Sequence, residues 1–218
     1  MGAREDICAA MVALVETGLN RGASGNISVR DGDHMLITPS GIPPRDILPA
    51  EVTRMALTGD GDWEGPKKPS VEWRFHRDIL RHRPDINAVV HTHAQWCTVL
   101  AIARRTIPAV HYMIAAFGGP EIRLAPYATF GTPDLSAGIL QAMEGRAGCL
   151  MANHGMVVGG RDLTHALWLA NELEALAHQH YHSLLIGGGQ VLSEAELEDT
   201  LKGFATYGTQ SKAEPQRT

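Results

Sequence analysis

Three histidines have the spacing of a metal site. His91 and His93 flank Thr92 at the end of a β-branched run, and His154 is followed by Gly155 at the end of another extended segment. Residues two apart in a strand point to the same side, so the first two imidazoles can converge on one ion. Three protein ligands and an open fourth position are the arrangement of catalytic zinc. The pattern therefore predicts a zinc centre formed by His91, His93 and His154.

Other metal families that use an HxH pair fit this chain less well. A cupin would have a glutamate a few residues after the pair, and residues 94–98 contain none. A barrel amidohydrolase needs a longer chain, and the HxHxDH of a metallo-hydrolase is interrupted by Gln95 and Trp96. Further histidines resemble surface or helix residues and are assigned no role: His34, His76, His82, His165, His178, His180 and His182.

The elements that must position these residues follow from hydrophobic spacing and turn signals. Helices are expected up to about Gly18 and over 72–82, 94–103, 133–143, 162–186 and 194–204. Extended segments are expected over 26–30, 34–38, 52–57, 87–93 and 122–128, and two strands that turn at His154 and Gly155 are expected over 149–160, with Ser70 capping the helix 72–82. Hairpins with helices against them predict an α/β protein, a three-layer α/β/α sandwich around a central, largely antiparallel sheet. We expect one domain over residues 1–218, with a flexible tail after about residue 208.

The composition fits a globular domain and argues against several partners. Of 218 residues, 44% are hydrophobic and 20% are charged, which allows a buried core. The formal net charge of −5 argues against a general nucleic-acid binder. No segment approaches the roughly 20 apolar residues of a membrane span, and the N-terminus does not form a signal peptide. Cys8, Cys97 and Cys149 form no CxxC pair or disulfide framework, so a reducing cytoplasm is the expected location.

Seven segments in order carry a resemblance to a known family. They are SGNISVR (24–30), ITPSGIP (37–43), EWRFH (72–76), NAVVHTH (87–93), HYMIAA (111–116), APYATFGT (125–132) and NHG (153–155). On these motifs the chain resembles the class II aldolase/epimerase family, and within it the L-fuculose-1-phosphate aldolases most closely. The similarity covers roughly residues 24–208. One such motif is weak, but seven in order are very specific.

The resemblance implies roles for the residues around the metal. It implies that His91, His93 and His154 hold zinc, for which Mn²⁺ or Co²⁺ could substitute. Glu72 is implied to be a fourth ligand at rest and an acid/base when substrate arrives. Without the family, Glu72 would be interpreted as complementing a helix dipole at its N-terminus. Tyr112 is implied to reach into a neighbouring subunit's site as a proton donor, within a homotetramer whose sites lie between subunits.

The resemblance also implies how a sugar phosphate would be bound. The residues implied to hold the phosphate are Gly25, Asn26, Ser40, Gly41 and Ser70. The family has two serines before the glutamate, and here the second position is Val71. The missing hydroxyl would remove a hydrogen bond worth about 1.5–3 kcal/mol to a charged acceptor. Phosphate binding is therefore expected to depend on the remaining donors.

At the other end of the pocket, aromatic residues are expected. The resemblance places Phe130 and Phe204 around the aldehyde portion of the substrate and Tyr207 over the pocket. These rings favour an apolar aldehyde tail, so the expected substrates are L-fuculose 1-phosphate, 5-deoxyribulose 1-phosphate and 5-methylthioribulose 1-phosphate. Cleavage would release dihydroxyacetone phosphate. Without the resemblance, however, the tyrosines would be interpreted as packing residues and the glycine-containing loops as turns.

The chemistry of such a cleavage is consistent with these side chains. A Lewis acid can hold the electrons left next to the carbonyl, Glu72 can return a proton to carbon 3, and Tyr112 can manage the carbon-4 hydroxyl proton. Rival hypotheses remain. A 4-epimerase would carry an aspartate at the position of Glu72, and a decarboxylase would need a different acid pocket. An adducin-like interaction module would lack the metal ligands.

Overall fold

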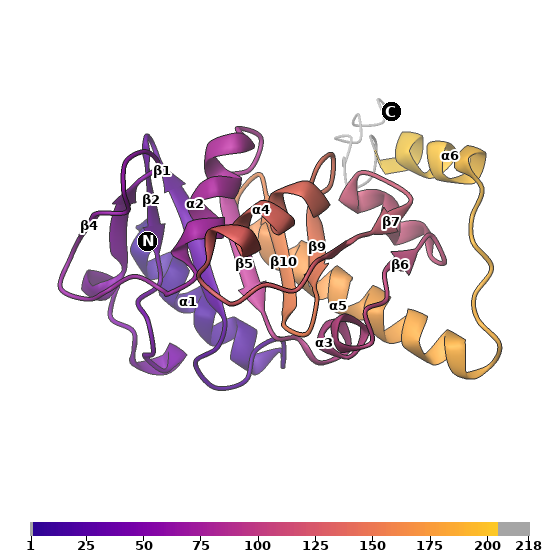
Figure 1. The fold of residues 1–218 in the computed structure, drawn as a ribbon, viewed down its shortest axis with the longest axis horizontal. Helices are drawn as coiled ribbons and strands as arrows, with labels where there is room; N and C mark the ends of the chain where they lie inside the picture. The colour runs from indigo at the N-terminus through magenta and orange to yellow at the C-terminus, as the bar shows by residue number, and fades with distance from the viewer. Residues whose placement is uncertain (1, 205–218) are drawn as a thin grey trace, which may run out of the picture.

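The computed structural model describes residues 2–204, and within them an eight-stranded sheet forms the centre of the fold (Figure 1). In order across the sheet, the strands are β4 (Trp63–Glu64), β3 (Thr53–Ala56), β2 (His34–Ile37), β1 (Asn26–Asp31), β5 (Ala88–Thr92), β10 (Gly155–Gly160), β9 (Gly148–Met151) and β8 (Leu124–Ala125). Neighbouring strands are antiparallel except for β8 and β9, which are parallel. The largely antiparallel sheet predicted from the sequence is confirmed.

Helices cover both faces of the sheet and give the predicted three layers. On one face lie α1 (Ala3–Glu16), α3 (Gln95–Ile102) and α5 (Leu163–Leu185), and on the other lie α2 (Trp73–His82) and α4 (Pro133–Ala142). Each helix buries its apolar stripe against strand residues, which produces two hydrophobic cores, one on each side of the sheet. None of the helices between residues 2 and 204 combines the length and apolar character that a membrane crossing needs.

Strand β5 contributes to both cores because its side chains alternate. Ala88 and Val90 pack into the core under α1, α3 and α5, whereas Val89 packs into the core under α2 and α4. The same alternation directs His91 toward α2, where its ring lies edge-on to Phe75 with centroids 5.6 Å apart. His91 therefore lies on the face of the sheet that α2 covers.

The remaining elements lie beyond the sheet. They are the short helices η1 (Pro44–Asp46), η2 (Pro49–Glu51) and η3 (Tyr112–Phe117), the ribbon of β6 (Ile107–Pro108) with β7 (Glu121–Ile122), and α6 (Glu194–Phe204), which packs against η3. The segment 122–128 was expected to be one extended piece, but β7 and β8 belong to different sheets. The predicted tail after about residue 208 lies outside the described residues.

One local prediction was wrong, and the burial of two histidines was not anticipated. Ser70 does not cap α2, because the helix begins at Trp73 and Glu72 is its N-cap; the Ser70 hydroxyl accepts a hydrogen bond from the Glu72 N–H at 3.3 Å. His76 and His180 were expected to be surface or helix residues; they lie on α2 and α5, but they are only 0% and 6% exposed. His76 faces the sheet from α2, and a single sequence does not show which face a histidine takes.

Candidate metal centre

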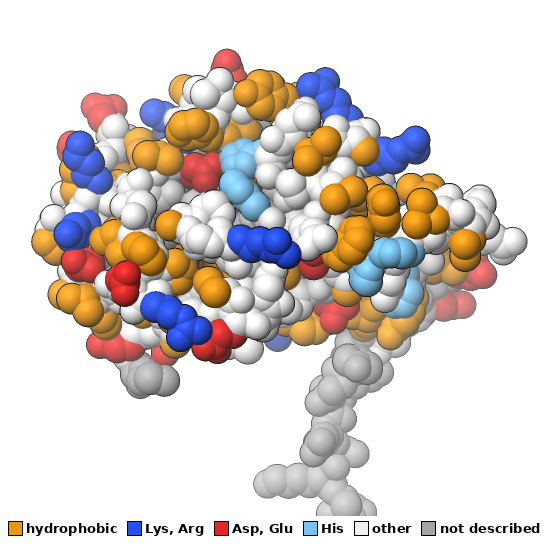
Figure 2. All heavy atoms as spheres, turned by 90° about the horizontal axis from the view of Figure 1, so that it is seen from below, with side chains coloured by type: hydrophobic (Ala, Val, Ile, Leu, Met, Phe, Trp, Pro, Cys, Tyr) orange, Lys and Arg blue, Asp and Glu red, His pale blue; other side chains and the backbone are white. Residues whose placement is uncertain are grey.

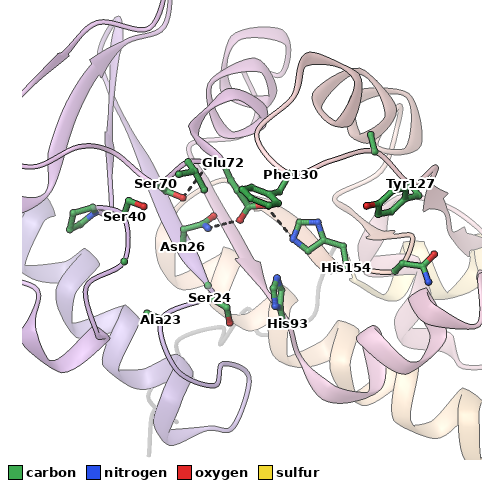
Figure 3. A pocket seen from close by; sticks show the side chains of 16 residues that line it. Ala23, Ser24, Asn26, Ser40, Ser70, Glu72, His93, Tyr127, Phe130 and His154 are labelled. Carbon is green, nitrogen blue, oxygen red and sulfur yellow. Dashed lines mark hydrogen bonds and ion pairs between the residues drawn. The ribbon is translucent and has the colours of Figure 1, made fainter.

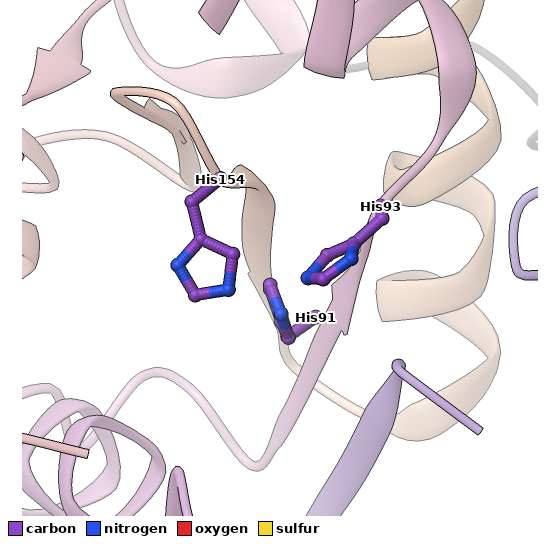
Figure 4. A group of neighbouring side chains, drawn as sticks. All are labelled: His91, His93 and His154. Atoms are coloured by element: carbon purple, nitrogen blue, oxygen red, sulfur yellow. The ribbon is translucent and has the colours of Figure 1, made fainter. Parts of the chain in front are cut away.

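The three predicted histidines meet on one side of the sheet. His91 is near the end of β5, His93 follows the strand directly, and His154 precedes β10 in the turn after β9. One ligand nitrogen from each ring lies within 4.8 Å of the other two, and Figure 4 shows the three rings facing a common point. His91 is fully buried, whereas His93 and His154 are partly exposed. The sequence-predicted triad is therefore brought together by the fold.

The turn before β10 is shaped by two residues with unusual backbone requirements. Asn153 has a positive φ of 56°, a left-handed conformation that asparagine tolerates better than most residues. A Cβ on Gly155 would lie 2.5 Å from the carbonyl oxygen of Thr92 and 3.0 Å from Cδ2 of His93. A glycine is needed at position 155 because the chain passes so close to the end of β5. This close approach places His154 opposite His93.

Glu72 contacts two of the three imidazoles from the N-cap of α2. Its Oε2 is 3.2 Å from Nε2 of His91, and its Oε1 is 3.2 Å from Nε2 of His154. Asn26 donates a hydrogen bond from Nδ2 to Oε2 at 2.9 Å, and the glutamate is only 5% exposed. The carboxylate thus contacts two rings of the triad from α2, and its role as a fourth ligand stays a prediction.

Electrostatic interactions between Glu72 and the histidines determine the charges of these side chains near neutral pH. Burial raises the pKa of Glu72, but the opposing effects of His91, His154 and Asn26 are larger, so the pKa is well below its usual range. Burial lowers the pKa of His91, but the carboxylate of Glu72 outweighs it and raises that pKa. Burial, reinforced by His91 and His154, lowers the pKa of His93 to about 4. Glu72 is therefore ionised and His93 is a neutral imidazole, the states that bind metal.

The donor set fits a divalent transition metal. The backbone oxygen of Met156 lies 2.8 Å from Nδ1 of His91, so this ring nitrogen donates and Nε2 is left for a ligand. Nε2 of His91 and Nε2 of His93 are buried and have no hydrogen-bond partner among the described residues. Buried lone pairs and a carboxylate that face one point need a positive charge between them. Three imidazoles and a carboxylate oxygen are ligands typical of zinc.

A cavity of about 460 Å³ opens beside these ligands (Figure 3). Glu72, His93 and His154 line it on one side. The five predicted phosphate-binding residues line it as well: Gly25, Asn26, Ser40, Gly41 and Ser70. On the face seen in Figure 2, histidine side chains lie next to an acidic one in a hollow of the surface. The loops that were expected to surround a phosphate therefore border the same cavity as the metal ligands.

The predicted aromatic residues are divided between two cavities. Phe130 lines the cavity beside the metal ligands and is 61% exposed. Phe204 lines a second cavity of about 920 Å³ together with Tyr112, and their rings stack with centroids 6.2 Å apart. Tyr112 is 51% exposed and is not among the residues that line the metal-side cavity. Tyr207 lies outside the described residues.

Several residues of the site were not found from the sequence. Tyr127 and Asn153 line the metal-side cavity, although both lie within the motifs already recognised. Glu174 on α5 accepts hydrogen bonds from the backbone N–H groups of Trp96 and Cys97 at 2.8 and 2.9 Å, which holds the start of α3 just after His93. Its spacing from the HxH pair gives no signal, because the contact is made across the fold.

Comparison with known proteins agrees with this geometry. The family model for the class II aldolase and adducin N-terminal domain matches residues 5–181. A 5-methylthioribulose-1-phosphate/5-deoxyribulose-1-phosphate aldolase of Rhodospirillum rubrum is 53% identical over 88% of this chain and 86% of its own. An L-fuculose phosphate aldolase of Escherichia coli is 47% identical over 93% of both chains. A solved L-fuculose 1-phosphate aldolase superimposes with a TM-score of 0.89 at 37% identity, over 94% of this chain and 98% of that one.

Proposed function

Because the chain belongs to the class II aldolase family, it is a lyase, and we propose that it reversibly cleaves a deoxyketose 1-phosphate to dihydroxyacetone phosphate and a small aldehyde. The observation that carries this proposal is the position of Glu72. Its buried carboxylate lies between the histidine triad and a cavity bordered by polar loops. Acid/base chemistry and sugar-phosphate binding can thus share one cavity.

We assign the resident metal to His91, His93, His154 and Glu72, with zinc as the preferred ion. When bound, such an ion supplies Lewis-acid polarisation of a substrate oxygen. His91 is held in one ring orientation by the Met156 carbonyl, and His93 is kept neutral by burial. His93 therefore presents an unprotonated nitrogen at neutral pH, whereas the raised pKa of His91 favours a proton that metal binding must displace.

Glu72 is the proposed acid/base. As an ionised carboxylate it can accept the proton from carbon 3 of dihydroxyacetone phosphate in the condensation direction, and return it to the same carbon in the cleavage direction. Its side chain is 5% exposed, so bulk water has little access to the proton that it carries. Asn26 donates to one of its oxygens and so keeps that oxygen oriented during the cycle.

The polar loops are proposed to hold the phosphate. Gly25 and Gly41 can present backbone N–H groups to an anion, and Ser40 and Ser70 add hydroxyls; the Ser40 N–H itself donates to the Lys68 carbonyl. Val71 also borders the cavity and is 53% exposed, so its isopropyl group stands where a hydroxyl was expected. The phosphate would then be held by neutral donors, the backbone N–H groups of the glycines and the serine hydroxyls.

Tyr112 is proposed to act in the site of a neighbouring subunit of a homotetramer. In the single chain it is exposed and stacks on Phe204, beside a cavity that none of the metal ligands line. A phenol in that position can handle the proton of the carbon-4 hydroxyl only if a second copy carries it to the metal. Phe204 would accompany Tyr112 into the same intersubunit site.

The aldehyde is proposed to carry an apolar tail. Phe130 is exposed at the cavity edge and offers an aromatic surface for a methyl or thioether group. The relatives from Rhodospirillum rubrum and Escherichia coli are named for deoxypentulose, methylthiopentulose and fuculose phosphates, which share such a tail. The free thiols of Cys8, Cys97 and Cys149 are consistent with the cytoplasm as the place of reaction.

The test is an assay of dihydroxyacetone phosphate released from a panel of ketose 1-phosphates. We expect release from the deoxy and methylthio substrates, faster than from fully hydroxylated ones, and loss of release after thorough chelation. Glu72→Gln should lower turnover by about 10²–10⁴-fold, the contribution of a positioned acid/base, while the exposed-site control Glu64→Gln keeps wild-type turnover. Release that survives metal removal, or isomerisation without release, would contradict the proposal.

A further inference from the structure

Two pairs of buried polar residues face each other between strand β1 and helix α2. Asn26 and Ser28 are two apart on β1 and so point to the same side, about 7 Å apart along the strand. Glu72 and His76 are four apart and lie one turn apart along α2, a rise of about 6 Å. The two spacings nearly match, so each side chain on the strand can meet one on the helix.

These side chains form a continuous chain of hydrogen bonds that ends on the acid/base. Asn26 Nδ2 lies 2.9 Å from Glu72 Oε2, His76 Nε2 lies 2.5 Å from Asn26 Oδ1, and Ser28 Oγ lies 2.8 Å from His76 Nδ1. Asn26 is 4% exposed, and Ser28 and His76 are 0% exposed. These three hydrogen bonds are therefore shielded from water.

The ionised carboxylate determines the direction of every hydrogen bond in the chain. A carboxylate only accepts, so Asn26 must turn its NH₂ group to Glu72 and its carbonyl oxygen to His76. The facing nitrogen, Nε2 of His76, must then carry the proton. His76 is neutral, since burial lowers its pKa to about 3, so its Nδ1 accepts from the Ser28 hydroxyl. All donors point toward Glu72.

We propose that His76 is a positioning residue for the acid/base: it fixes the orientation of the Asn26 amide and, through that amide, the carboxylate of Glu72. Without the Nε2–H donor, the Asn26 amide can rotate and present its oxygen to the carboxylate, which repels it. Glu72 would then lose its neutral hydrogen-bond donor and its fixed orientation toward His91 and His154. The turnover part of this proposal rests on the proposed aldolase function.

A purely structural histidine would behave differently. His76 stacks on Phe75 with ring centroids 4.7 Å apart, so any replacement disturbs packing and lowers stability. A packing role, however, does not require one tautomer and does not connect to the metal ligands. The experiments therefore measure the tautomer, the metal affinity and the turnover per folded molecule.

The first experiment is ¹⁵N NMR of histidine side chains in the full-length protein, with the His76 signals assigned by comparison with His76→Gln. We expect the proton of His76 on Nε2, with Nδ1 bare. A proton found on Nδ1 would reverse the donor and acceptor roles of these hydrogen bonds and overturn the proposal. This measurement needs neither substrate nor a folded His76→Leu variant.

The second experiment compares variants by chelator competition for Zn²⁺ and by turnover. His76→Leu should lower zinc affinity, turnover or both by about 10–100-fold, the effect of removing partners that orient a metal site. His76→Gln should recover most of the loss, because its amide can place an N–H near the position of Nε2. His180→Leu is the matched control, since His180 is also buried but lies on α5 and does not line the metal-side cavity.

A double-mutant cycle tests whether His76 acts through Asn26. In an Asn26→Ala background, His76→Leu should have little further effect on zinc affinity or turnover. Full additivity of the two changes, or wild-type affinity and turnover in His76→Leu, would overturn the proposal. If the wild type releases no dihydroxyacetone phosphate from any substrate, the proposed function fails, while the tautomer and the zinc affinities still decide the role of His76.

Discussion

The close passage of Gly155 over strand β5 makes Gly155→Ala a sharp test of how the metal ligands are positioned. The added Cβ would lie 2.5 Å from the Thr92 carbonyl oxygen, below the 3.0 Å that real Cβ contacts respect. The two strands must therefore separate by at least 0.5 Å at this point. The same atom would be 3.0 Å from Cδ2 of His93, so the ring must also move.

The expected cost follows from this overlap. Overpacking of a buried contact costs about 1–3 kcal/mol in the free energy of unfolding, and each kcal/mol lowers the melting temperature of a domain of this size by about 2–4 °C. Metal affinity should fall more noticeably, because a site is held to within about 0.5 Å of its working geometry. We expect a loss of about 10–100-fold in zinc affinity, as for other changes that reorient metal ligands.

The assay is a competition between the protein and a chromophoric chelator for Zn²⁺, together with thermal melts of the metal-free protein. Arg81→Ala is the control, because Arg81 is exposed on α2 and is not among the residues that line the metal-side cavity. That change should leave zinc affinity unaltered and shift the free energy of unfolding by no more than about 0.5 kcal/mol. Zinc affinity in Gly155→Ala equal to that of the wild type would refute the reasoning that this contact positions His93.

Three further predictions concern other parts of the molecule. Burial raises the pKa of the Cys149 thiol well above its usual range, so it should resist alkylation in the native protein; because an unfolded thiol ionises near about pH 8.5, urea melts should show its contribution to stability falling as pH rises above that value, and a native thiol that is alkylated rapidly at pH 8 would contradict this. Glu174→Ala should lower the free energy of unfolding by about 0.5–2 kcal/mol, since it removes the acceptor for two N–H groups of α3; an unchanged urea midpoint would exclude that role. Mixing unfolded Glu72→Gln and Tyr112→Phe chains and refolding them together should give more turnover than either variant alone, and no gain would exclude a site shared between subunits.

Most of the fold was predictable because its elements have strong local signals. The helix predicted over 194–204 was found with the same bounds, and the β1–β2 hairpin follows from alternating residues around Gly32. The short elements were missed for a physical reason. Helix η3 and the ribbon of β6 and β7 are too short to show a period, and they exist because neighbouring elements pack against them.

The metal centre was predictable because strand periodicity places His91 and His93 on one side. His154 was chosen as the third ligand because it stands at a strand end before a glycine, whereas Glu72 needed the ordered family motifs, since nothing in local spacing shows that distant segments meet. His76 was missed, because the sequence alone does not show that α2 turns this residue toward the sheet. Glu72 and His76 are one helical turn apart, and Asn26 and Ser28 are polar residues two apart in a strand. Only the packing of α2 on β1 brings these two pairs together.

The place of β5 in the sheet separates the site into parts that should open on different timescales. β5 is paired on both edges, with β1 on one side and β10 on the other, so its amides should exchange with solvent only when the whole domain unfolds. Glu72, by contrast, stands at the first turn of a helix, where local opening is easy. His91 should therefore keep its place for as long as the domain is folded, while the acid/base and the neighbouring loops can move. New substrates could therefore be accommodated by changing the loops alone, with the histidine framework left intact.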